Sequence, residues 1–321
     1  MWSSIPTVLT LLLAVSGSVA TKDKDHRKSC IVKSGGSNAT DDAPDVDVDI
    51  YDTLLWSTDI QYWLNNSMDV GYQNQSTALI IGGDNVRING HGTGTFDANT
   101  DGADTIRSSH ITFNNWTVYN GDDSLSMKAH STDITIKNCK FHNGLGIAMG
   151  SIGHYNDQYE TIERVTAENI EYVNTLHAFY IKTWTADQNG YPPNGGGGGL
   201  GFASGMKLTY LTTTCFRGAA FAISQRPRFS GAPGVGNCTN SEFQVRNMEI
   251  DGLYGDSKSA RVASLQCSAV VPCTNITMVN VGLHLTNGTP AAQYLCGNIA
   301  NPSRFNCTGT PCVGGSATGE C

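Results

Sequence analysis

The sequence predicts an all-β protein that coils into a single-domain parallel β-helix, and three observations carry this expectation. Glycine is abundant, with 36 residues in a chain of 321, and only 15% of the residues are charged. Such a composition suits many short strands joined by turns. An eight-residue phrase also recurs along the chain at intervals of 23 to 41 residues, which indicates a solenoid of stacked repeats.

The recurring phrase reads apolar, any, apolar, any, Asn, apolar, any, apolar, with Tyr210 in the Asn place of one copy. Its copies are ITFNNWTV from Ile111, ITIKNCKF from Ile134, VTAENIEY from Val165, MKLTYLTT from Met206, FQVRNMEI from Phe243 and ITMVNVGL from Ile276. Alternation predicts a strand with one buried face, and Asn tolerates the left-handed backbone angles of a corner. Rows of Asn should therefore stack and share hydrogen bonds. The alternative, an antiparallel β-sandwich, does not explain six copies in one register.

The N-terminus has the features of a removable secretory signal. An apolar run from Val8 to Val15 is too short to span a bilayer, and the small residues Ser18 to Ala20 precede a charged stretch. We therefore expect a secreted, extracellular protein without a membrane anchor. The predicted organisation is a signal peptide at 1–20, an N-terminal segment at 21–44 and one β-helix domain at 45–321.

All ten cysteines lie beyond this signal, so disulfides are expected. The spacing suggests three pairs: Cys267 with Cys273, Cys296 with Cys307, and Cys312 with Cys321. No Cys-x-x-Cys pattern or His cluster indicates a metal site. Eight glycosylation sequons are coherent with secretion; they begin at Asn38, Asn65, Asn74, Asn115, Asn237, Asn275, Asn287 and Asn306.

The net charge of −8 gives no basic surface for nucleic acid. The stretch from Thr185 to Gly205 is the largest predicted surface loop and should border a groove. Its five consecutive glycines lack the Lys-Ser/Thr that follows in a phosphate-binding loop.

Acidic residues concentrate in one window, where Asp101 and Asp104 precede Asp122 and Asp123. Asp101 lies 21 positions before Asp122, about one coil of such a helix. Neighbouring coils are only about 4.8 Å apart, so these carboxylates should meet on one face. Repulsion between them should raise at least one pKa, which would leave one group protonated while another is ionised.

Two kinds of chemistry need such carboxylates. Glycoside hydrolysis uses one carboxylic acid to protonate the leaving oxygen and a carboxylate to activate water. Calcium-assisted β-elimination from a uronate would need further oxygen ligands and a strong base. The acidic residues by themselves leave both reactions open.

Four segments resemble the signatures of the polygalacturonase family, glycoside hydrolase family 28. They are NTDGAD from Asn99, NGDD from Asn120, GLGIAMGSIG from Gly144 and YIKT from Tyr180. The resemblance runs from about Asp45 to the C-terminus, and stretches such as KTWTADQNGYPPNGGGGGLG look like the fungal exo-acting galacturan 1,4-α-galacturonidases.

This resemblance implies an inverting hydrolase on a right-handed parallel β-helix that removes terminal galacturonic acid from pectic polysaccharides or oligosaccharides. Asp122 would be the general acid, while Asp101 and Asp123 would hold and deprotonate the water. Lys182 would contact a substrate carboxylate, and Asn99 and Tyr180 are further expected substrate contacts. The resemblance implies no cofactor and a protein that works as a single chain.

Two departures from the family pattern put the sugar in question. Leu145 stands where the family usually has His, and Tyr180 replaces an Arg that could grip a carboxylate with two hydrogen bonds. An α-L-rhamnosidase or a rhamnogalacturonan hydrolase is therefore the main alternative. His177 could substitute as a substrate ligand, although a lone His is more often structural.

A third departure is length, because the chain runs directly from Pro44 to Asp45 and from Ala98 to Asn99, where relatives have longer stretches. We hypothesise that internal blocks are missing through mis-splicing of the gene model or degeneration. A second alternative function is then an inactive carbohydrate-binding remnant. Transcript reads that join the codons of Ala98 and Asn99 without an extra exon would refute mis-splicing there.

Overall fold

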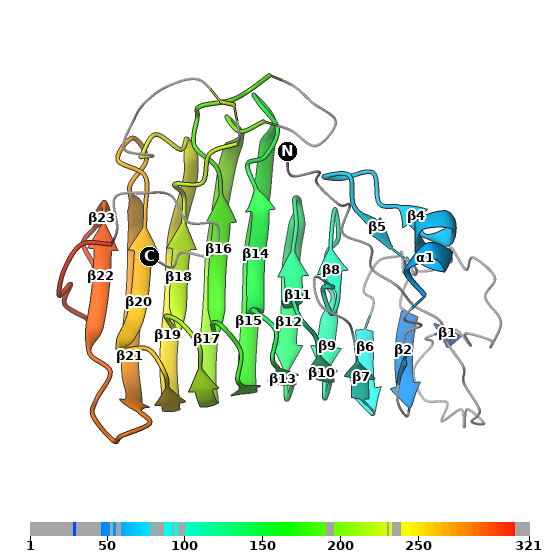
Figure 1. Cartoon of the computed structure of the whole chain (residues 1–321), viewed down its shortest axis with the longest axis horizontal. Coiled ribbons are helices and arrows are strands. Elements are labelled where there is room, and N and C mark those ends of the chain that lie inside the picture. Colours follow the sequence, from blue (N-terminus) through cyan, green and yellow to red (C-terminus); the bar gives the residue numbers. More distant parts are fainter. Residues whose placement is uncertain are drawn as a thin grey trace.

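The computed structural model describes residues 28–29, 46–51, 54–55, 59–77, 80, 87–91, 93–95, 100–190, 196–229, 231–232 and 239–311. The predicted signal peptide, Asn99 and the expected Cys312–Cys321 pair lie outside these residues. The described chain forms a parallel β-helix whose coils stack along one long axis (Figure 1), as the repeated phrase predicts.

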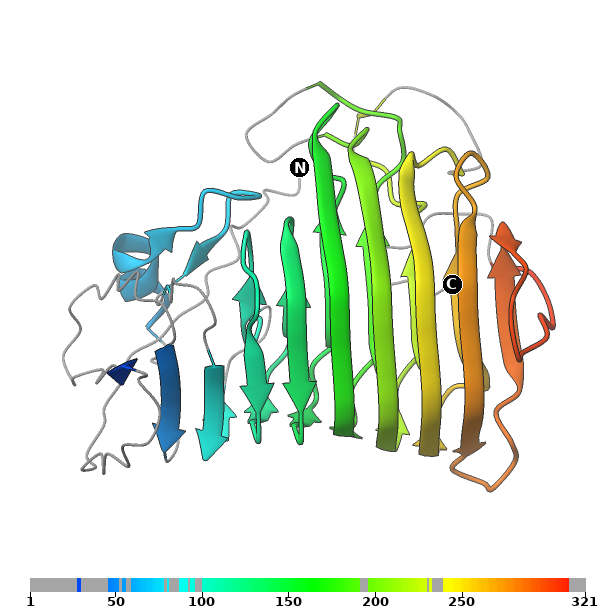
Figure 2. The same ribbon diagram turned by 180° about the vertical axis from the view of Figure 1, so that it is seen from behind.

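One 14-stranded sheet supplies two walls of the solenoid. The first wall holds β1 (Lys28–Ser29), β2 (Val46–Tyr51), β6 (Arg87–His91), β9 (Thr112–Asn114) and β12 (Ser131–Lys137). The second holds β3 (Leu54–Leu55), β7 (Thr93–Thr95), β10 (Thr117–Tyr119) and β13 (Lys140–His142). Both walls continue into long bent strands, which run side by side in Figure 2: β15 (Tyr159–Val173), β17 (Leu200–Phe216), β19 (Phe243–Ser257) and β21 (Cys273–Leu285), followed by β23 (Ile299–Ala300).

A separate seven-stranded sheet forms the third wall and carries the candidate site. Its strands, in spatial order, are β8 (Asp104–Thr105), β11 (Asp123–Met127), β14 (Gly146–Ile152), β16 (Phe179–Thr183), β18 (Phe221–Ser224), β20 (Arg261–Gln266) and β22 (Gln293–Gly297). Within the described residues, β8 is its terminal strand on the N-terminal side, whereas the other sheet continues through β6 to β2.

The N-terminal coil departs from the solenoid pattern. After β2 and β3 the chain forms the short helix α1 (Ile60–Asn66) and the antiparallel pair β4 (Met68–Asp69) and β5 (Ser76–Thr77). No helix in the described part of the chain has the length and apolarity needed to cross a membrane.

The left-handed corner predicted from the phrase is present in all six copies. Backbone φ angles are positive at Asn115 (58°), Asn138 (54°), Asn169 (56°), Tyr210 (55°), Asn247 (56°) and Asn280 (54°). The predicted ladder is also present, because the Asn169 amide donates to Asn138 at 2.7 Å. Asn138 donates in turn to Asn114 at 3.0 Å, the residue just before the corner.

The copy FQVRNMEI does not share this register, so the expectation of six copies in register was wrong for one. Strand pairing sets Met206 against Met248, which places Asn247 opposite Gly205 at a different corner. The residue that stacks on Tyr210 is Gly252, whose φ is 83°. Gly and Asn both adopt left-handed angles, so the phrase alone does not distinguish the two corners.

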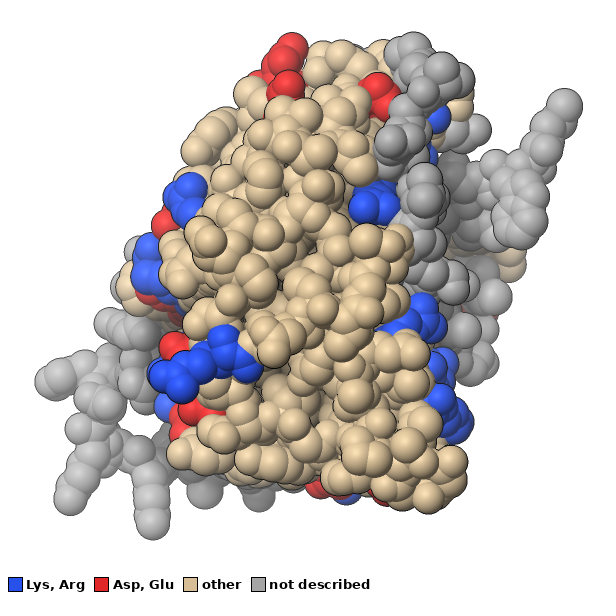
Figure 3. All heavy atoms as spheres, turned by 90° about the vertical axis from the view of Figure 1, so that its left-hand side faces the viewer, with Lys and Arg blue, Asp and Glu red and all other residues tan. Residues whose placement is uncertain are grey.

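The core fills the space between the three walls with apolar side chains from the described coils between Ile111 and Ala291. Phe141, Tyr172 and Phe216 form an aromatic column, with ring centroids 5.9 and 5.5 Å apart. Two predicted disulfides, Cys267–Cys273 and Cys296–Cys307, are confirmed. Both disulfides lie at the C-terminal end of the solenoid. Figure 3 shows this end of the molecule, where charged side chains lie mainly along the margins.

The glycine-rich loop is shorter than predicted, because β17 already begins at Leu200. The four glycines from Gly196 to Gly199 are buried, and a Cβ on Gly199 would lie 2.3 Å from the carbonyl carbon of Gly153. The amides of Gly196 and Gly197 both donate to the backbone oxygen of His154. Absence of side chains therefore lets this segment pack directly against the end of β14.

Candidate active site

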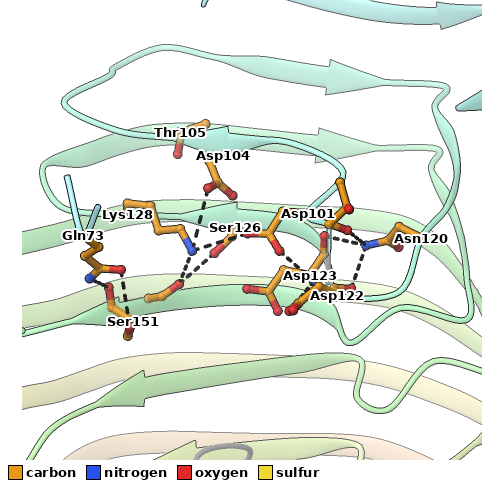
Figure 4. Close-up of polar contacts among 12 residues, drawn as sticks. Gln73, Asp101, Asp104, Thr105, Asn120, Asp122, Asp123, Ser126, Lys128 and Ser151 are labelled. Carbon is orange, nitrogen blue, oxygen red and sulfur yellow. Dashed lines mark hydrogen bonds and ion pairs between the residues drawn. The ribbon is translucent and has the colours of Figure 1, made fainter. Parts of the chain in front are cut away.

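The three aspartates expected to meet do so at the N-terminal edge of the seven-stranded sheet (Figure 4). Asp123 begins β11, Asp122 precedes it, and Asp101 lies just before the adjacent strand β8. One carboxylate oxygen from each lies within 4.8 Å of the others. This confirms the expectation that stacked coils bring these residues together on one face.

Hydrogen bonds fix the geometry of this cluster. The backbone N–H of Asp123 donates to Asp101 Oδ1 at 3.2 Å and to Asp122 Oδ1 at 3.0 Å. The side-chain amide of Asn120 donates to the backbone oxygens of Asp122 and Asp123 at 2.7 and 2.8 Å. It also reaches the carbonyl of Thr100 at 3.2 Å, so Asn120 ties the two coils together.

Two glycines of the motifs are required by close backbone approach. A Cβ on Gly102 would lie 2.2 Å from the backbone oxygen of Ser124, and the Gly102 amide donates to the Asp123 carbonyl at 2.8 Å. A Cβ on Gly144 would lie 2.3 Å from Oδ1 of Asn120. Larger residues at either position would push the carboxylate-bearing turns apart.

The carboxylates differ in exposure and in pKa. Burial, and then the nearby charge of Asp101, raise the pKa of Asp122 to about 6. Burial first and Asp101 second also raise the pKa of Asp123 well above its ordinary value. Asp123 is buried, whereas Asp122 is only partly buried. Asp122 is therefore the group best placed to present a proton to a bound substrate at mildly acidic pH.

Tyr180 occupies the position at which the resemblance leads us to expect Arg. Its hydroxyl donates to Asp123 Oδ1 at 2.5 Å. Its ring belongs to a small apolar cluster with Leu145, Ala148 and Ala222, in which Leu145 is the partly exposed member. This surface offers no cation where the family pattern has His and Arg.

Lys182 lies two residues further along β16, and its Nζ is 5.1 Å from the centroid of the Trp184 ring. Burial lowers the pKa of its ammonium group, although Asp123 acts in the opposite direction. Among the described residues, no carboxylate lies within 4.0 Å of Lys182 Nζ. Its charge is therefore available to an anionic ligand group.

His177 does not reach the cleft. Its side chain is fully buried, and Nδ1 lies 2.6 Å from the carbonyl oxygen of Ala219. Its ring is 5.1 Å from that of Tyr180. The geometry favours the structural role over the ligand role that the sequence also allowed, because the ring supports Tyr180 from below.

Lys128 and Asp104 belong to the site but were not predicted as site residues. Lys128 Nζ lies 3.6 Å from Asp101 Oδ2 and 3.9 Å from Asp104 Oδ2, and donates to the carbonyl of Gly150 at 2.8 Å. The alternation in SLSMK, which continues from β11 to Lys128, could have placed Lys128 on the same face as Ser126. Gln73 was also missed; its side chain donates to the Ser151 carbonyl at 2.6 Å beside this group.

The cluster of three carboxylate oxygens has a spacing that could hold a cation. Lys128 already supplies positive charge beside Asp101, however, and Tyr180 supplies a proton donor to Asp123. These neighbours fit proton transfer between carboxylates and a substrate better than coordination of a divalent ion, which would be repelled by the ammonium group.

A parallel β-helix with this carboxylate cluster on its third wall has the groups that glycoside hydrolysis needs. A model of the glycosyl hydrolases family 28 matches residues 66–191. The α-L-rhamnosidase rgxB of Aspergillus niger is 42% identical over 429 aligned positions, covering 98% of this chain and 100% of the relative. The chain therefore belongs to glycoside hydrolase family 28, a family of pectin-degrading glycosidases.

Other relatives agree with this assignment. Exopolygalacturonase X-1 of Emericella nidulans is 31% identical over 234 positions, covering 70% of this chain and 52% of the relative. The crystal structure of endo-xylogalacturonan hydrolase from Aspergillus tubingensis has the same fold, with a TM-score of 0.54 and 18% identity over 90% of each chain.

The comparison also bears on the predicted missing blocks. The alignment with the rhamnosidase is 429 positions long, and this chain can contribute at most its 321 residues. At least 108 aligned positions, the difference between these numbers, therefore hold residues of the relative alone. This agrees with the hypothesis that internal segments are missing, although the carboxylate cluster itself is complete.

Proposed function

We propose that this protein is an α-L-rhamnosidase that acts on pectic chains containing rhamnose. The observation that carries the proposal is the apolar cluster beside Asp123, in which Leu145 is partly exposed and packs against the buried Tyr180. Rhamnose has a methyl group on C5 where galacturonate has a carboxylate. An apolar surface accommodates a methyl group, whereas it leaves a buried carboxylate without a partner.

The sequence analysis placed the galacturonidase first and the rhamnosidase second, and we reverse this order. The 42% identity to a rhamnosidase over nearly the whole chain supports the reversal. The galacturonidase stays as the second candidate, because Lys182 offers a positive charge to a substrate carboxylate. In a chain of alternating sugars, Lys182 would meet the galacturonate next to the rhamnose.

In either case the described carboxylates divide the work of glycoside hydrolysis. Asp122, with its raised pKa, protonates the glycosidic oxygen as the bond to the leaving group breaks. Asp101 and Asp123 hold a water molecule and take its proton as its oxygen attacks the anomeric carbon. Tyr180 holds Asp123 in position for this step.

Inversion at the anomeric carbon is proposed from the family resemblance. The closest oxygens lie within 4.8 Å, less than the roughly 6.5–9.5 Å common between the two carboxyl groups of inverting enzymes. A third carboxylate allows the water to sit between Asp101 and Asp123 rather than between a single pair. NMR of the first-formed sugar anomer tests this: a product with retained configuration would refute inversion.

The sugar is tested by measuring release from an aryl α-L-rhamnoside, from rhamnogalacturonan oligosaccharides with terminal rhamnose and from oligogalacturonate. We expect turnover of the rhamnosyl substrates, and loss of about 10²- to 10⁴-fold in Asp122→Asn. Turnover of oligogalacturonate alone would establish the second candidate. Binding without turnover, equal in wild type and Asp122→Asn, would instead indicate the inactive remnant.

A further inference from the structure

We propose that Lys128 is a positioning residue for the reaction: it fixes the side chain of Asp101 and supplies the positive charge that keeps the carboxylate cluster active. The inference rests on the acid–base roles proposed above and holds for either sugar. It concerns a residue that lies beneath the cleft and touches the carboxylates rather than the substrate.

The side chain of Lys128 is buried and hydrogen-bonded and does not extend into solvent. Only 3% of the residue is exposed, and its Nζ is bonded to the Gly150 carbonyl at 2.8 Å. The Ser126 hydroxyl donates to the same carbonyl at 2.8 Å, so the neighbouring strand β14 holds the ammonium in place (Figure 4). From there Nζ faces Asp101 Oδ2 at 3.6 Å.

Asp101 is thereby held from two sides. Its Oδ1 accepts the backbone N–H of Asp123, and its Oδ2 faces Lys128. A carboxylate with both oxygens engaged cannot rotate freely, so its orientation toward a water shared with Asp123 is preset.

A buried lysine is costly to charge unless anions compensate, and here they do. Although burial acts to lower it, the pKa of Lys128 is raised overall, by Asp104 and Asp101 before the more distant Asp123 and Asp122. In return its charge lowers the pKa of Asp122 and of Asp123 relative to what burial alone would give. The other groups that face this cluster are Lys182 from β16, the Tyr180 hydroxyl, and His154, whose pKa burial lowers to about 3.

The competing explanation is that Lys128 only neutralises Asp104. Asp104 Oδ2 lies 3.9 Å from Nζ, and the pKa of Asp104 is raised mainly by burial. The experiment must therefore remove this partner first. Asp104→Asn serves as the reference protein, and Lys128→Met is added to it. The double variant then contains no Asp104 carboxylate that the loss of Lys128 could leave buried without its partner.

The measurement is the pH profile of kcat/KM on whichever substrate the wild type hydrolyses, together with NMR titration of the aspartate carboxyl carbons without substrate. We compare Asp104→Asn/Lys128→Met with Asp104→Asn. In the double variant, both limbs of the pH profile should move upward by about 1 pH unit. The carboxyl titrations of Asp122 and Asp123 should move upward by the same amount. Asp104→Asn/Lys128→Arg, which keeps the charge, should restore the position of the limbs.

Equal limb positions and equal carboxyl titrations in the double variant and in Asp104→Asn would overturn the proposal and leave Lys128 a stabilising residue. Because the carboxyl titration needs no substrate, it gives an answer even if the assignment of the sugar fails. That failure would show as an absence of turnover of rhamnosyl substrates by the wild type.

Discussion

The Tyr180 hydroxyl lies 2.5 Å from Asp123 Oδ1, and this contact replaces a cation of the family pattern by a neutral hydrogen-bond donor. An Arg at this position would bring a second positive charge toward the cleft besides Lys182. Tyr180 instead donates its hydroxyl to the carboxylate of Asp123, while its ring packs in the apolar cluster with Leu145. One substitution therefore affects both the acid–base chemistry and the sugar that fits.

We expect Tyr180→Phe to lower kcat by about 10- to 100-fold, because a hydrogen bond to a charged group is worth about 1.5–3 kcal/mol. The same hydrogen bond lowers the pKa of Asp123, so the acid limb of the pH profile should move to higher pH. Steady-state kinetics across pH checks both effects. An unchanged limb would mean that Tyr180 only packs against its neighbours.

The pair Leu145→His and Tyr180→Arg restores the family residues at two positions. Because the new side chains can hold a carboxylate, we expect the ratio of kcat/KM for rhamnosyl over galacturonosyl substrates to fall by at least about tenfold. Leu145→Met with Tyr180→Phe is the apolar control and should keep the preference. If both pairs change the ratio equally, the apolar surface does not determine specificity.

The pH dependence of the reaction should reflect Asp122. Its pKa of about 6 lies above the ordinary value, so it is protonated and able to act as an acid below that pH. We expect kcat/KM to decline above pH 6, approaching about tenfold per pH unit. Aryl substrates with leaving groups that need no proton should lose this alkaline limb. A limb that persists unchanged with such substrates would assign it to another group.

Asp104→Asn should stabilise the folded protein at pH 7 but not at low pH. Burial raises the folded-state pKa of Asp104 above its unfolded value of 3.8, so wild-type stability is greatest below that pH and falls as the pH rises through the folded-state pKa. Asn removes this loss at pH 7. Thermal unfolding at several pH values checks the sign: a lower Tm for the variant at pH 7 would contradict it.

The corner residues give a matched stability test. Asn169→Ala loses the 2.7 Å bond to Asn138 and places Ala at a φ of 56°, so we expect a loss of about 1–2 kcal/mol. Tyr210→Asn, at the stacked corner with φ 55° and an exposed ring, should gain up to about 1 kcal/mol. Urea unfolding measures both. Destabilisation by Tyr210→Asn would show that contacts of the Tyr210 ring stabilise the folded protein.

Several features of the site could be predicted from the sequence, because they depend on short stretches of the chain. The motifs around Asp101 and Asp122 identified the carboxylates that meet on the third wall, and their catalytic role stays a proposal. The alternation in β11 placed Leu125 and Met127 in the core. The adjacent cysteines of two pairs were also predictable, because close spacing limits their partners. Secretion and glycosylation stay predictions.

The sequence by itself determined the solenoid, since strand alternation and left-handed corners are local properties that each coil carries independently. Only the tertiary structure decided the register of FQVRNMEI, the burial of His177 and the contact of Lys128 with Asp101. These depend on which residues of neighbouring coils lie side by side. That pairing is set by packing across loops of unequal length, and no single stretch of sequence encodes it.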